Sequence, residues 1–136
     1  MTKKLWLLLL LAVAALAAEA SRSIWDGVFS ADQVARGKKI YKAECADCHG
    51  EKLEGIDKAS PLTGPIFFKN WTNKSIDRLI ATTRRTMPPD DPNTYSRQLC
   101  TDVIVYILSE NGYPTGKTDL APDAPDLRQI VIEPKK

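Results

Sequence analysis

The stretch Cys45-Ala46-Asp47-Cys48-His49 decides how the rest of the chain is interpreted. C-x-x-C-H is the spacing at which c-type haem is attached, with two thiols for thioether bonds and a histidine for the iron. On a turn of helix, two cysteines three residues apart face the same side. The same short pattern also occurs by chance, in zinc sites and in redox C-x-x-C pairs, so the remaining residues must discriminate between these alternatives.

The small number of other ligand residues favours haem. His49 is the one histidine of the chain, and there are three cysteines. A four-ligand zinc site would need His49 and every cysteine, including the distant Cys100. The sequence therefore favours haem over zinc. Apart from the initiator Met1, Met87 is the one methionine. A haem with histidine and methionine axial ligands needs one residue of each kind.

The first 20 residues have the pattern of a secretory signal peptide. Two lysines at positions 3 and 4 precede an apolar block, residues 5–18, and Ala18-Glu19-Ala20 follows as an A-x-A cleavage site. The alternative is an uncleaved membrane anchor, but an apolar block of this length is short for a bilayer. We therefore expect cleavage after residue 20, export to the periplasm and no stable membrane span in the mature protein.

Length and charge limit the remaining possibilities. The chain has 136 residues and a formal net charge of +2, enough for one small domain with a modest core. Its basic residues are dispersed among acidic ones, so no nucleic-acid partner is indicated. Export fits the cysteines, because covalent haem attachment is completed outside the cytoplasm.

Two longer helices are predicted to form the frame. Ser30 and Gln33 match a capping box, which predicts a helix over 30–44. Gly37 and Tyr41 lie on one face of it, and a glycine there lets another helix cross at close range. A broad apolar stripe predicts a second helix over 96–111, buried against the first with Tyr106 in the contact. On that helix Cys100 is expected to be a buried small hydrophobic residue, with a surface thiol as the alternative.

The segment between these helices supplies the other candidate site residues. A loop over 51–65, rich in proline and glycine, contains Ser60 and Pro61, our candidates for a backbone carbonyl that accepts from the His49 ring. Trp71 belongs to an aromatic cluster that follows, and is a candidate for a hydrogen bond to a haem propionate. A short helix over 76–84 leads to Met87, whose thioether the next two prolines hold on a stiff loop.

Taken together, these motifs resemble a small class I cytochrome c. The resemblance rests on Gly37-x-x-x-Tyr41-x-x-x-Cys45-x-x-Cys48-His49, on Met87-Pro88 and on the apolar residues 102–108 of the last helix. It extends to a bacterial subgroup through residues 25–29, 62–65 and 111–116 and through Trp71. Members of that subgroup are similar to haem domains associated with quinoprotein dehydrogenases that use pyrroloquinoline quinone.

The resemblance implies an all-α fold of three to five helices around one covalently bound haem c. It implies thioether attachment at Cys45 and Cys48, with His49 and Met87 as the axial ligands of the iron. Cys100 departs from the family pattern in the last helix, and Ser60 stands where many relatives have a proline. We expect a signal peptide (1–20), an arm (21–30), a cytochrome domain (31–118) and an extended tail packed on it (119–136).

The function expected from this reading is periplasmic one-electron transfer by a monomer that is not itself an enzyme. The partners expected are redox proteins, with a quinoprotein dehydrogenase as candidate donor and a terminal oxidase or another cytochrome as candidate acceptor. One alternative is a haem enzyme or gas-binding protein in which Met87 dissociates, although no second histidine is present for acid–base chemistry. Another is a thiol oxidoreductase that uses Cys45 and Cys48.

Overall fold

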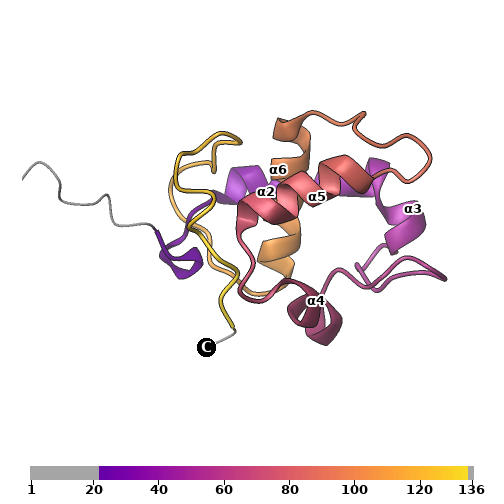
Figure 1. The fold of residues 1–136 in the computed structure, drawn as a ribbon, viewed down its shortest axis with the longest axis horizontal. Coiled ribbons are helices and arrows are strands. Elements are labelled where there is room, and N and C mark those ends of the chain that lie inside the picture. The colour runs from indigo at the N-terminus through magenta and orange to yellow at the C-terminus, as the bar shows by residue number, and fades with distance from the viewer. Residues whose placement is uncertain (1–21, 135–136) are drawn as a thin grey trace, which may run out of the picture.

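The computed structural model describes residues 22–134, and the predicted signal peptide lies outside this range. The described residues form α-helices and one 3-10 turn, with no β-strand among them beyond two isolated bridges. The fold is therefore all-α, as predicted. Figure 1 shows the arrangement. The helices are η1 (Ile24–Asp26), α2 (Ala31–Glu44), α3 (Ala46–His49), α4 (Gly64–Trp71), α5 (Ile76–Thr86) and α6 (Arg97–Glu110).

Helices α2 and α6 cross in close contact and form the frame of the molecule. A Cβ atom on Gly37 would overlap the backbone carbonyl of Asp102 and would lie 3.0 Å from Cβ of Tyr106. Next to this point the rings of Tyr41 and Tyr106 pack with centroids 5.4 Å apart. The predicted crossing at Gly37 is confirmed, and a residue without a side chain is what permits it.

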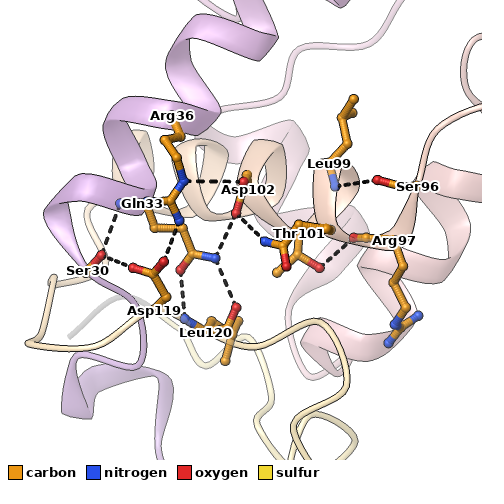
Figure 2. Close-up of polar contacts among 11 residues, drawn as sticks. Ser30, Gln33, Arg36, Ser96, Arg97, Leu99, Thr101, Asp102, Asp119 and Leu120 are labelled. Carbon is orange, nitrogen blue, oxygen red and sulfur yellow. Dashed lines mark hydrogen bonds and ion pairs between the residues drawn. The ribbon is translucent and has the colours of Figure 1, made fainter.

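The start of α2 differs from the prediction in one respect. The Ser30 hydroxyl accepts from the Gln33 backbone N–H at 3.0 Å, as a helix cap does. The Gln33 side chain, however, does not turn back to close a capping box. It is buried and donates to Asp102 of α6 and to the Leu120 carbonyl, while its own oxygen accepts from the Leu120 N–H at 2.7 Å (Figure 2). Tertiary partners thus outcompete the local one.

The segment ahead of α2 belongs to the core. Phe29 is fully buried, and Trp25 packs on Tyr113 with ring centroids 4.8 Å apart. The backbone of Gly116 packs closely against the same segment. Its N–H donates to the Phe29 carbonyl at 2.6 Å, and a Cβ atom on Gly116 would overlap the carbonyl of Gly27. The predicted arm thus contributes Phe29 to the core, and Trp25 packs against that core.

Helix α4 was not predicted. Our loop over 51–65 runs into it, because α4 begins at Gly64 and has Pro65 in its first turn, a position that suits proline. Within it Phe67 is buried, whereas Ile66 is 43% exposed. Ile66 therefore faces away from the core, while the aromatic residues Phe67, Phe68 and Trp71 pack in it or against it.

The C-terminal tail packs along the domain, as Figure 1 shows in yellow. Its backbone pairs with the residues around the start of α5, because the Ile132 N–H donates to the Lys74 carbonyl at 2.8 Å and the Ile76 N–H donates to the Ile130 carbonyl at 2.9 Å. All three isoleucines are fully buried. Among the described residues, none of the helices has the length and apolar character needed to cross a membrane.

Candidate haem-binding site

The C-x-x-C-H motif forms a single turn of helix at the end of α2. Cys45 is the C-cap residue of α2 and the N-cap residue of α3. Its carbonyl accepts from the backbone N–H groups of Cys48 and His49 at 3.3 and 2.9 Å. The turn therefore sets the two thiols on one side, as their spacing predicts. Cys45 is partly buried against the core and Cys48 is exposed.

The His49 ring is oriented by the loop that follows it. Its Nδ1 atom lies 3.0 Å from the Ser60 carbonyl oxygen. A carbonyl can only accept, so Nδ1 carries the proton and Nε2 keeps the lone pair that a metal binds. Of our two candidate carbonyls, Ser60 makes this contact and Pro61 does not. The departure from the family pattern at Ser60 does not remove the acceptor.

Further contacts, which we did not predict from the sequence, hold this loop in place. The Tyr41 hydroxyl donates to the Gly50 carbonyl at 2.7 Å, directly after His49. Asn111, at the end of α6, donates to the Leu62 carbonyl and accepts from the Gly64 N–H, at 2.9 and 3.0 Å. Both side chains are buried. The tyrosine was predicted only as a packing residue, and no sequence pattern gives the partner of a buried amide.

Met87 ends helix α5 and begins the connection to α6. Its N–H donates to the Thr83 carbonyl at 2.9 Å, its backbone is extended, and its side chain is partly buried. Helix α5 extends two residues beyond the predicted end, to Thr86. The methionine is therefore tied to a helix on one side and followed by Pro88 on the other, so its backbone position is well defined.

Trp71 and Cys100 occupy different environments. Trp71 is the last residue of α4, partly exposed, with the Lys74 ammonium 5.3 Å from the centre of its ring. Its bond to a propionate stays a prediction. Cys100 lies in α6 at 1% exposure, which confirms the buried hydrophobic reading and rejects the surface thiol.

The state of the thiols bears on the redox alternative. Burial, with a smaller effect of Glu44, raises the pKa of Cys45 to about 11. A reactive C-x-x-C pair needs a thiolate, which requires a lowered pKa. No three His, Cys, Asp or Glu side chains within 22–134 gather where they could share a metal ion. The environment of Cys45 suits a sulfur in a thioether better than a redox nucleophile.

The donor set fits haem c. Two sulfurs lie on one turn, a histidine with its Nδ1 atom engaged follows directly, and a methionine caps helix α5 elsewhere in the domain. A comparison with family models gives the same answer. Residues 32–107, more than half of the chain, match the family described as cytochrome c oxidase, cbb3-type, subunit III.

The chain belongs to the cytochrome c family. This cytochrome has the class I fold, and haem-based electron transfer is the activity typical of its family. Among solved structures, it is similar to a chain in the crystal structure of the sulfane dehydrogenase SoxCD from Paracoccus pantotrophus, with 24% identity and a TM-score of 0.52. The match covers 79% of the cytochrome and 61% of the other chain, so it spans less than two thirds of that chain. A search of curated proteins found no match.

Proposed function

We propose that this cytochrome is a periplasmic one-electron carrier with one covalently attached haem c and histidine–methionine ligation. The observation that carries the proposal is the His49 ring, whose Nδ1 atom faces the Ser60 carbonyl within the C-x-x-C-H turn. That bond fixes the ring and makes Nε2 the better electron donor to a metal. Bound haem c supplies a couple that gains and loses a single electron.

Each site residue has a separate task in this proposal. Cys45 and Cys48 would hold the haem through thioether bonds, and His49 and Met87 would take the two axial positions. With both axial positions filled by the chain, a substrate has no place on the iron, which favours a carrier over a catalyst. A thioether ligand also raises the reduction potential relative to a second histidine.

The location and partners belong to the same proposal. The signal-peptide pattern of residues 1–20 supports export to the periplasm. A quinoprotein dehydrogenase is the proposed electron donor, and a terminal oxidase or another cytochrome the acceptor. The similarity to a chain from a sulfane dehydrogenase is consistent with a cytochrome that works beside a dehydrogenase. Transient partners of this kind use small interfaces steered by charge.

The test is export of the full chain in a host that has haem-attachment machinery. The wild-type protein should keep its haem after denaturation and should titrate reversibly as a one-electron couple. Cys45→Ala/Cys48→Ala should lose covalent haem, and Cys100→Ala, the matched control, should retain it. A protein without haem would return the two cysteines to the thiol hypothesis. Immediate binding of carbon monoxide by the wild-type ferrous protein would indicate an open haem site instead.

A further inference from the structure

The connection between α5 and α6, residues 88–95, is held by hydrogen bonds of two kinds. Three of them stay inside the segment or join it to the end of α5. The Asp91 N–H donates to the Pro88 carbonyl at 3.1 Å and the Asn93 N–H to the Arg84 carbonyl at 3.0 Å, while Arg84 Nε donates to the Tyr95 carbonyl at 3.2 Å. Because Arg84 contacts both Asn93 and Tyr95, the part of the connection near α6 is held against the end of α5.

The fourth hydrogen bond leaves the segment. The Tyr95 hydroxyl donates to a carboxylate oxygen of Glu44 at 2.9 Å, across 51 residues of sequence. Glu44 is the last residue of α2 and is joined by one peptide bond to Cys45. The Tyr95 ring packs against the core, so the hydroxyl is presented from a supported position. This contact joins the segment that begins at Met87 to the segment that begins the C-x-x-C-H turn.

We propose that the Tyr95–Glu44 hydrogen bond is a latch that holds the Met87 segment against the haem-attachment turn. Tyr95 and Glu44 are then positioning residues for the sixth iron ligand. The inference rests on the proposed ligation by Met87 and goes beyond it, because it names what keeps that ligand in place. Neither residue touches the iron in this account. They act by limiting how often Met87 moves away.

The chemistry of the pair is suited to this task. Burial, together with the hydrogen bond to Glu44, raises the pKa of Tyr95 to about 12, so the hydroxyl keeps its proton at neutral pH and remains a donor. A hydrogen bond to an ionised acceptor is stronger than one between neutral groups. Two long side chains that reach across the surface would contribute little if both were mobile, but the Tyr95 carbonyl is itself bound by Arg84.

Binding of imidazole to the ferric holoprotein measures this opening. Imidazole takes the sixth position only when the methionine has left, so its apparent affinity is proportional to the fraction of open molecules. Tyr95→Phe keeps the ring and removes the donor. Because this hydrogen bond is exposed and water partly replaces it, we expect the apparent affinity to rise about twofold, the low end for one hydrogen bond lost from the closed state. Glu44→Ala should give a similar rise. Glu44→Gln, which keeps an acceptor oxygen, should give a smaller one.

Tyr113→Phe is the matched control. Its hydroxyl donates to the Glu133 carbonyl at 2.5 Å and ties down the tail, so this variant also loses a tyrosine hydrogen bond, but one outside the Met87 segment. It should lower resistance to denaturant and leave the imidazole affinity unchanged. The double variant Tyr95→Phe/Glu44→Ala should not exceed either single variant, because one bond is removed in all three.

The possible outcomes separate the latch from the proposed function. If the wild-type protein has methionine ligation and Tyr95→Phe binds imidazole with unchanged affinity, the latch is wrong and the proposed function stands. An equal rise in Tyr113→Phe would also overturn the latch, since general loosening would then explain both. If the wild-type protein lacks methionine ligation, the proposed function fails, and the latch fails with it.

Discussion

The crossing of α2 and α6 and the connection from Met87 to Tyr95 are built in different ways. The crossing is a buried contact between two helices, where the Gly37 backbone lies directly against that of Asp102. The connection is rich in proline, mostly exposed, and fastened by a few polar contacts at its ends. The frame thus depends on packing, which tolerates no added atom, whereas the position of the proposed distal ligand depends on individual hydrogen bonds.

The largest expected effect is at the crossing. Gly37→Ala places a methyl group where the Asp102 carbonyl already lies, and backbone atoms on two helices cannot shift independently. We expect a loss of about 3 kcal/mol in the free energy of unfolding, at the upper end for overpacking. Denaturant unfolding measures it. Lys38→Ala, at the exposed next position of α2, should be nearly neutral. Equal stability of the two variants would contradict the close contact.

A pair of glutamines tests the polar part of the same frame. Gln33 and Gln98 both donate to one oxygen of Asp102 at 2.9 Å, but Gln33 is fully buried and Gln98 is exposed. Gln33→Leu leaves buried partners unsatisfied and should cost about 2 kcal/mol of unfolding free energy. Gln98→Leu should cost less than about 0.5 kcal/mol, since water replaces its amide. A reversed order would show that burial does not set the value of these bonds.

Tyr41 joins the frame to the haem-binding turn. Tyr41→Phe removes the donor to the buried Gly50 carbonyl and keeps the ring contact with Tyr106. We expect a loss of about 1 kcal/mol in unfolding free energy. Hydrogen exchange of the backbone amides from Cys48 to Gly50 should quicken relative to those of α6. Exchange that quickens equally in both regions would contradict a local role for the hydroxyl.

The smallest expected effect is at the ion pair that joins Arg22 to the tail. Arg22 hydrogen-bonds Asp126 at 2.7 Å and lowers the pKa of its carboxyl below 3.8, the ordinary value. Because the folded pKa is depressed, this contribution is present above about pH 4 and is lost as pH falls through the folded pKa. Asp126→Asn should cost about 0.5 kcal/mol at pH 7, as the pair is partly exposed. In acid the difference should disappear. A constant difference across this range would contradict the ion pair.

The frame formed by α2 and α6 could be predicted from the sequence, because the helical periodicity of apolar residues indicates which face of a helix is buried. The helix over 30–44 and the one over 96–111 have nearly the observed ends, Ala31–Glu44 and Arg97–Glu110. Gly37 was correctly interpreted, since a glycine inside an amphipathic helix has few roles other than close packing. Helix α4 was missed because Gly64 and Pro65 signal a loop when viewed locally, although proline is also favoured in the first turn of a helix.

The residues of the candidate site could be predicted from the sequence only in part. The spacing of Cys45, Cys48 and His49 specifies their local geometry, because all three lie on one turn. The Ser60 carbonyl was one of two candidates, and only the fold of the loop selects it. The partners of Gln33 and Tyr95 are distant in sequence and polar, and polar pairing has no periodicity that a single sequence could reveal.

In the proposed function, the chain itself supplies both axial ligands of the haem iron. Its most direct test is the visible spectrum of the oxidised holoprotein, wild type and Met87→Ala, in the red region where a bond from methionine sulfur to ferric iron absorbs weakly. We expect the wild-type protein to have this band, Met87→Ala to lose it, and only the variant, once reduced, to bind carbon monoxide at once. A wild-type protein without the band, or a band unchanged in Met87→Ala, would contradict axial ligation by Met87.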